Sequence, residues 1–166
     1  MKLGLLRNPV AGSARARKRW PALLSAFRQA FDTVELAETD AADDTARLAR
    51  HLALDGADLV VAVGGDGTLG ETVDGLLTAG LSSPPHFSFV MQGTGSDFSR
   101  NFPAVSPIEA VPAAIAAAPA RPLDIGLLTC VDVEGRAHQR HFVNIASFGV
   151  SGPTVKAVNG ARRGHW

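Results

Sequence analysis

The sequence predicts an α/β protein built on a parallel sheet, and three observations support this prediction. Strand-like apolar runs alternate with helical patterns from residue 3 to about residue 118. Residues 59–63, LVVAV, are apolar throughout, which is typical of a strand covered on both faces. Glycine-rich stretches follow this run and the next one. In an open α/β sheet, loops at the carboxyl ends of strands bind ligands, so we expect a site there.

The spacing of apolar residues predicts the individual elements. Short apolar runs predict strands at residues 3–6, 33–36, 59–63 and 87–91. Helical spacing predicts helices around residues 20–31, 48–52 and 69–77, and the last of these should start near Thr68. Thr39 and Asp40 can cap the second of these helices. Residues 106–109, SPIE, have the pattern of a capping box with proline at the first helical position, and this predicts the start of an alanine-rich helix.

The pattern changes after Pro119. Residues 123–133 and 139–148 are strand-like, with Glu134-Gly135 as a hairpin turn and no helix between them. Two strands with one apolar face cannot close a core alone. The sequence therefore predicts an α/β domain over residues 1–120, followed over residues 121–166 by the beginning of an incomplete, β-rich second domain.

Composition excludes several classes of protein. The 16 basic and 16 acidic side chains cancel, so no strong overall field favours nucleic acid. Cys130 is the only cysteine, which excludes a disulfide framework and a cysteine zinc site. No run approaches the ~18 apolar residues of a membrane span, and the first residues resemble a strand rather than a signal peptide. We expect a cytoplasmic enzyme or binding protein.

The segment that follows the third predicted strand, GGDGTLGE at residues 64–71, is a candidate phosphate site. Residues without Cβ let a ligand approach the main chain, and free N–H groups at a helix N-terminus favour an anion. The alternative is a tight turn that needs glycine only for its backbone angles. Asp66 would repel a phosphate unless a divalent cation or a hydroxyl nucleophile lies between them.

Two common nucleotide loops fit this segment poorly. A Walker loop ends in Gly-Lys-Ser/Thr, and no lysine lies between Lys18 and Lys156. Gly65, Gly67 and Gly70 satisfy the G-x-G-x-x-G spacing of dinucleotide-binding folds. That loop, however, follows the first strand and needs an acidic residue at the end of the next one, where this chain has Met91-Gln92.

A second glycine loop, GTGSDF at residues 93–98, follows the fourth predicted strand. Adjacent parallel strands would bring the two loops together. Asp66 and Asp97 would then face one cleft, with Thr68 and Thr94 as hydroxyl donors. The alternative for Asp97 is a helix N-cap, in which case it has no part in the site.

Taken in order, these segments resemble the diacylglycerol kinase catalytic domain, which bacterial lipid kinases share with diacylglycerol, sphingosine and ceramide kinases. The resemblance is carried by NPVAG at residues 8–12, by Thr39 with Asp44 and Ala46, by GGDGTLGE at 64–71 and by GTGSDF at 93–98. RPLDIG at 121–126 and FVNIASFG at 142–149 resemble the opening of the family's second domain. The glycine–aspartate loop is shared with NAD kinases and related to that of phosphofructokinases, whereas the ordered set is more specific.

The resemblance implies an ATP-dependent lipid kinase, with ATP and Mg²⁺ bound between two domains. The γ-phosphate would pass to a hydroxyl of diacylglycerol, a sphingoid base or a related lipid. Asp66 would lie near the phosphates, either directly or through Mg²⁺, and Asp97 near the acceptor hydroxyl or the metal, as the catalytic residues. The matching positions imply ATP contacts at Asn8, Thr39, Gly65, Asp66, Gly67, Thr68, Leu69, Gly70, Glu71 and Thr94. The magnesium ligands and the catalytic base are expected beyond Trp166, so no metal ligand is assigned in this chain.

This chain departs from the family pattern at several positions. The family favours asparagine where this sequence has Gly70, Asp74 and Ser96, and leucine where it has Gln92. These changes concern the acceptor side of the site more than ATP binding. Family members are also considerably longer, so we expect this chain to be truncated and its activity alone to be uncertain.

Three other functions remain open. An NAD kinase-like phosphotransferase would also use ATP, although the 93–98 loop and Asn8-Pro9 argue against it. A non-catalytic remnant would bind nucleotide or a partner without turnover. A dinucleotide-dependent oxidoreductase would follow from the glycine spacing alone, but it lacks the acidic ribose ligand.

The expected partners follow from the same arguments. Arg15, Arg17, Lys18 and Arg19 precede Trp20, and such a basic patch could touch an anionic membrane or could simply be a solvated helix face. Peripheral membrane contact and a homodimer are therefore both open, and nucleic acid is not expected. His138 and His141 lie at an odd separation on a predicted strand, so they should point to opposite faces rather than bind one metal.

Overall fold

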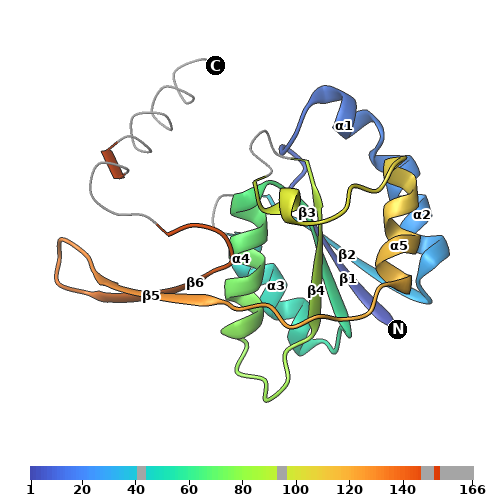
Figure 1. Cartoon of the computed structure of the whole chain (residues 1–166). Coiled ribbons are helices and arrows are strands. Elements are labelled where there is room, and N and C mark those ends of the chain that lie inside the picture. The colour runs from blue at the N-terminus through green and yellow to red at the C-terminus, as the bar shows by residue number, and fades with distance from the viewer. Residues whose placement is uncertain (41–43, 93–96, 147–151, 154–166) are drawn as a thin grey trace.

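The computed structural model describes residues 1–40, 44–92, 97–146 and 152–153 (Figure 1). The strands are β1 (Lys2–Arg7), β2 (Thr33–Glu38), β3 (Leu59–Gly64), β4 (His86–Met91), β5 (Gly126–Val131) and β6 (Ala137–Phe142). The helices are α1 (Ala14–Lys18), α2 (Trp20–Ala30), α3 (Asp44–Leu54), α4 (Asp66–Leu77) and α5 (Val111–Ala117), with 3₁₀ turns η1 (Phe98–Asn101) and η2 (Ile108–Ala110).

The first four strands form a parallel sheet, as the sequence predicts, and the structure shows their order to be β2-β1-β3-β4. Alternate residues of its central strands feed two hydrophobic cores. Leu5 and Val61 pack with Phe27 of α2 on one face. Leu6 and Val60 pack with residues of α3 and α4 on the other face. Every residue of β3 is buried, which confirms the prediction of a strand covered on both sides.

Helices α3 and α4 cover the same face of the sheet and approach each other closely (Figure 1). The contact depends on Gly75, because a Cβ at this position would lie 2.2 Å from the main-chain oxygen of Ala46. Since real Cβ atoms do not come so near a backbone oxygen, glycine sets the spacing of the two helices. This packing fixes α4, the helix that begins at Asp66.

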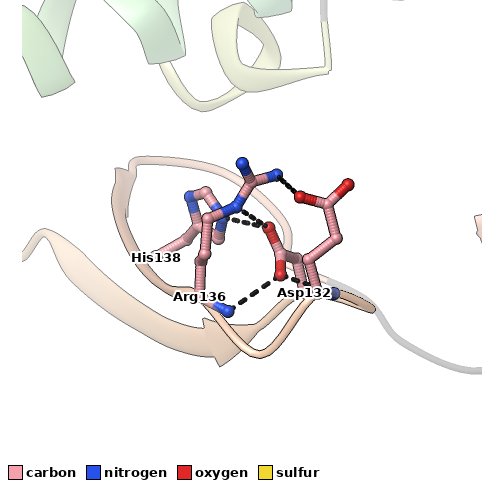
Figure 2. A network of polar contacts seen from close by, with 4 residues as sticks. Asp132, Arg136 and His138 are labelled. Atoms are coloured by element: carbon pink, nitrogen blue, oxygen red, sulfur yellow. Dashed lines mark hydrogen bonds and ion pairs between the residues drawn. The ribbon is translucent and has the colours of Figure 1, made fainter.

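β5 and β6 form the predicted antiparallel hairpin, separate from the main sheet. Gly135 adopts a φ of 81° in the turn, a conformation that favours glycine. Figure 2 shows how Arg136 and His138 converge on Asp132. Asp132 also accepts hydrogen bonds from the main-chain N–H groups of Glu134 and Arg136. The hydrogen bond from His138, followed by those from Arg136, lowers the pKa of Asp132 from 3.8 to about 2.

The predicted capping box at residues 106–109 does not form. Residues 108–110 form η2 instead, and neither η2 nor α5 has a side-chain cap within the described part of the chain. The carboxylate of Glu109 accepts hydrogen bonds from Nε and Nη2 of Arg19, at 3.0 and 2.5 Å. A bidentate ion pair of this kind is stronger than a neutral capping bond, so it competes successfully for Glu109. The proline in the first turn is Pro112 of α5 rather than Pro107.

Candidate active site

The ends of the four parallel strands meet at one edge of the sheet, as expected for an open α/β fold. Main-chain hydrogen bonds hold the segments that follow the strands. Asn8 N–H donates to the carbonyl of Val63 at 3.0 Å, and Thr39 N–H donates to the carbonyl of Arg7 at 3.0 Å. Asn8, Thr39 and the start of α4 therefore lie along the same edge.

Helix α4 begins at Asp66, two residues earlier than the sequence suggests. Its N-cap is Gly65, and within the described residues no side chain caps this end. The first-turn N–H groups are therefore free of side-chain caps, and the helix dipole favours an anion near them. Asp66 itself lies in the first turn, where the same dipole favours a carboxylate.

Unusual backbone angles do not explain the glycines of the first loop. Positive φ angles occur elsewhere in the described chain, and none of the four glycines between residues 64 and 70 has one. A Cβ at Gly64 would lie 2.4 Å from the Thr68 hydroxyl, so this glycine makes room for that buried side chain. Among described atoms, a Cβ at Gly67 or Gly70 would meet nothing within 4 Å. These two glycines therefore face open space, which favours ligand approach over the tight-turn alternative.

The second glycine loop is connected to the first at both of its described ends. Gln92 N–H donates to the carbonyl of Gly64 at 2.6 Å. Phe98 N–H donates to Oδ1 of Asp66 at 3.4 Å, and the Phe98 ring is buried against Leu69. The predicted meeting of the two loops is thus present in the structure. Thr94, the remaining candidate of this loop, lies outside the described residues, as do residues 93, 95 and 96.

Asp97 lies beside this junction and is exposed. It is positioned as the N-cap of η1, but its side chain makes no capping bond with any described residue. Its carboxylate instead forms an ion pair with Nη1 of Arg100 at 2.8 Å. The side chain of Asp97 remains 53% exposed and that of Arg100 75% exposed. Both groups are therefore accessible to a ligand from solvent.

The loop at residues 8–12 packs against the end of β4. Gly12 has a φ of 80°, and a Cβ there would lie 2.5 Å from the main-chain oxygen of Gln92. A shallow hollow of about 170 Å³ lies beside this contact. Its lining includes Ser13, Arg15, Arg19, Gln92 and Ile108. The three candidate loops thus form one continuous edge.

The basic residues near α1 are arranged differently from a simple aromatic-flanked patch. Arg17 donates to the carbonyl of Gly12 at 2.7 Å, and Arg19 pairs with Glu109. Trp20 is only 8% exposed, and the Arg7 guanidinium lies 4.3 Å from the centre of its ring. The indole is therefore part of the core rather than a surface anchor.

Sequence reasoning missed one contact between distant segments. Oδ1 of Asp74, on α4, accepts hydrogen bonds from the main-chain N–H of His141 at 2.8 Å and from its ring Nδ1 at 2.9 Å. His138 bonds to Asp132 within the hairpin, so the two histidines do act separately, as their spacing predicts. The departure at position 74 was visible in the sequence, but nothing in the sequence pointed to its partner 67 residues away.

The described residues contain no group of three or more His, Cys, Asp or Glu side chains that could by itself hold a metal ion. Mg²⁺ is usually held by one or two carboxylates together with substrate phosphates. Asp66, half-buried beside the open first turn of α4, fits that requirement. In the same described part of the chain, no helix is both long and apolar enough to cross a membrane.

The fold and this edge define an open parallel α/β domain with a candidate phosphate site. A family profile for the diacylglycerol kinase catalytic domain matches residues 2–128. A diacylglycerol kinase of Bacillus subtilis (strain 168) is 33% identical over 147 residues, which is 87% of this chain and 45% of the relative. A diacylglycerol kinase of Staphylococcus saprophyticus is 30% identical over 149 residues, with 87% and 44% covered.

Solved structures of similar chains have the same fold over most of this chain. A diacylglycerol kinase structure from Bacillus anthracis str. Sterne superposes with a TM-score of 0.65 at 24% identity, and 86% of this chain and 46% of that chain are covered. A further chain from the same organism gives a TM-score of 0.66 at 27% identity, with 75% and 44% covered. The protein belongs to the diacylglycerol kinase catalytic domain family. It spans less than half the length of the curated relatives described above.

Proposed function

We propose that this chain supplies the ATP-binding half of a lipid kinase, which transfers the γ-phosphate of ATP to the hydroxyl of diacylglycerol or a related lipid. One observation carries the proposal. No described side chain caps the first turn of α4, and a Cβ on Gly67 or Gly70 would meet no described atom within 4 Å. This turn lies next to a carboxylate that is hydrogen-bonded to the second loop. Family membership supplies the class of reaction.

The proposed nucleotide contacts come from the ends of all four parallel strands. Main-chain N–H groups of the first turn of α4 would bind phosphate oxygens, because they point out of the helix end. Asn8 and Thr39 would contribute from the ends of β1 and β2, and Thr94 from the second loop. The proposed set is that of the resemblance: Asn8, Thr39, Gly65, Asp66, Gly67, Thr68, Leu69, Gly70, Glu71 and Thr94.

Asp66 and Asp97 have different environments and so different proposed roles. Asp66 is half-buried at the helix end, and it would hold Mg²⁺ together with phosphate oxygens. When bound, Mg²⁺ neutralises charge on the phosphates. Asp97 is more exposed, and we place it near the acceptor hydroxyl. Phosphoryl transfer needs mainly positioning and charge neutralisation, so a site without a phosphate-loop lysine is chemically sufficient.

We further propose that the protein works in the cytoplasm and meets its lipid at the membrane surface. The exposed cations Arg15, Arg17 and Lys18 on α1 lie at the same end of the molecule as the candidate loops (Figure 1). Attraction of such cations to anionic lipid is worth about 1 kcal/mol each near the surface. A homodimer is a further proposal, and size-exclusion chromatography with light scattering would test it.

The activity test joins this chain to the second domain of a family member and measures transfer of labelled phosphate from ATP to diacylglycerol, sphingosine or phosphatidylglycerol in mixed micelles. We expect label in one of these lipids and its loss in Asp66→Asn. That variant should fold normally while its ATP binding loses its response to Mg²⁺, and a wild-type response would remove the metal role of Asp66. Label in NAD instead of lipid would favour the NAD kinase alternative. ATP binding without transfer to any acceptor would favour a non-catalytic nucleotide-binding module.

A further inference from the structure

The base of the β5–β6 hairpin is attached to α4, the helix whose first turn carries the proposed nucleotide site. Ile125, just before β5, and Val143, just after β6, pack against a buried cluster. That cluster contains Leu69 and Val73 of α4 together with Phe98. Apolar contacts of this kind hold the hairpin near α4, but they are non-directional and do not fix its orientation.

The hydrogen bonds between Asp74 and His141 are directional, so they can fix the orientation of the hairpin relative to α4. A single carboxylate oxygen accepts one bond from the main chain of β6 and one from the ring of the same residue. The side chains of Asp74 and His141 are only 13% and 24% exposed, so water competes weakly for these bonds. Hydrogen bonds to a charged group are stronger than neutral ones. Two of them on one residue restrict both the place and the rotation of β6.

From this geometry we propose that Asp74 and His141 form a joint that positions the β5–β6 hairpin, and the β-rich unit it begins, relative to the proposed nucleotide site. The inference rests on the proposed function. Asp66 and Asp74 are eight residues apart on one helix, which is about 12 Å at 1.5 Å per residue. A rigid helix thus connects the joint to the site. The pair are positioning residues, because neither belongs to the proposed set of nucleotide contacts.

Orientation matters for this reaction because in-line transfer tolerates little misplacement. A shift of about 1 Å far from the chemistry can cost about 100-fold in rate. Among the described residues, the other side-chain hydrogen bonds of the hairpin connect hairpin residues with one another, so they do not replace the joint. If the joint is removed, the hairpin should stay folded and attached but lose its fixed orientation.

The decisive experiment measures the position of the hairpin directly. Cys130 on β5 is exposed and is the only cysteine, and Ala22 on α2 is exposed on the far side of the sheet. Spin labels on Cys130 and on Ala22→Cys report their separation by pulsed electron resonance. We expect one narrow distance peak in the parent protein and loss of that peak in Asp74→Ala, which removes both bonds. His141→Ala removes only the ring bond and keeps the main-chain bond, so it should broaden the peak less. Asp74→Asn keeps an oxygen acceptor and should restore the narrow peak.

A matched control separates positioning from general stability. Lys2→Ala removes ion pairs with Glu35 and Asp55 at the opposite end of the sheet, and it should leave the distance peak unchanged. A narrow peak in Asp74→Ala at the parental distance would overturn the proposal. So would equal broadening in Lys2→Ala, because both results would show that the pair does not set the orientation.

A second readout connects the joint to catalysis. In Asp74→Ala we expect kcat for lipid phosphorylation to fall by about tenfold or more, with KM for ATP within about twofold of the parent, because the pair acts on orientation rather than on nucleotide binding. An unchanged kcat would overturn the link to catalysis. Failure of the parent protein to phosphorylate any lipid would count against the proposed function instead, and the distance measurement would still decide the joint.

Discussion

The parallel sheet and the β5–β6 hairpin differ in what stabilises them. All six residues of β3 are buried, and they contribute to hydrophobic cores on both faces of the sheet. In β5, only Gly126 is half-buried and the other five residues are exposed. The sheet is therefore held by apolar burial on both sides. The hairpin is held by its turn, by the bonds around Asp132 and by its attachment to α4.

The largest effect should come from the sheet core. Phe27→Ala removes a fully buried ring between α2 and the sheet, and it should lower the free energy of unfolding by about 3–5 kcal/mol. Leu128→Ala, at a hairpin residue that is 43% exposed, should change it by no more than about 0.5 kcal/mol. Urea denaturation of both variants measures the contrast. Similar losses would mean that the hairpin contributes to the core.

A smaller effect should come from the contact between α3 and α4. Gly75→Ala places a Cβ against the Ala46 carbonyl and should cost about 1–3 kcal/mol, because a backbone atom must move. In Gly70→Ala, on the same helix, the added Cβ would meet no described atom within 4 Å. This variant should be neutral or stabilise the protein by up to about 1 kcal/mol. Thermal unfolding of the pair measures this difference. The opposite order of stabilities would show that α4 does not pack as described.

Gly67→Val separates binding from folding within the α/β unit. Its Cβ meets no described atom within 4 Å, so the fold should survive with a cost of no more than about 1 kcal/mol. The added branches would instead occupy the space through which a phosphate approaches the main chain. We expect Mg·ATP affinity to fall at least about tenfold, or ~1.4 kcal/mol. Unchanged affinity in calorimetry would remove the argument for the glycine cradle.

The smallest effect should be the acid response of the hairpin turn. The folded-state pKa of Asp132 is about 2, below its ordinary value of 3.8. The hydrogen bonds to ionised Asp132 therefore stabilise the folded hairpin turn fully above pH 3.8, and this stabilisation is lost as the pH falls through about 2. The amide NMR shifts of Glu134 and Arg136 should change with a midpoint near pH 2, and Asp132→Asn should abolish the change. A midpoint near 3.8 would show that the turn network does not form in solution.

The succession of strands along the chain was predictable because each strand of the parallel sheet has a local apolar signature, whereas the strand order β2-β1-β3-β4 comes from the structure. The 59–63 run identified β3, and the glycines after it placed a loop at the correct edge. The start of α4 was placed two residues late, because glycine lowers helix propensity although Asp66 and Gly67 fit a first turn. Helix propensity is a local property of the sequence, so it does not register that the rest of the fold holds these two residues in the first turn of α4.

The parts of the site that could not be predicted depend on contacts between distant segments. Local spacing favoured a capping box at Glu109, but the guanidinium of Arg19, 90 residues away, binds this side chain. The bonds from Phe98 to Asp66 and from His141 to Asp74 likewise join segments whose proximity only the fold determines. Single-sequence patterns identify which residues carry chemistry, whereas the partners of those residues follow from packing.

A calorimetric titration of this chain with Mg·ATP, with NADH as the competing ligand, tests most directly whether the edge at the start of α4 is a nucleotide site. We expect micromolar binding of Mg·ATP, no binding of NADH and loss of the ATP signal in Gly67→Val. Tight NADH binding would instead support a dinucleotide site. A folded chain that binds neither ligand would contradict the assignment of the α4 edge as a nucleotide site.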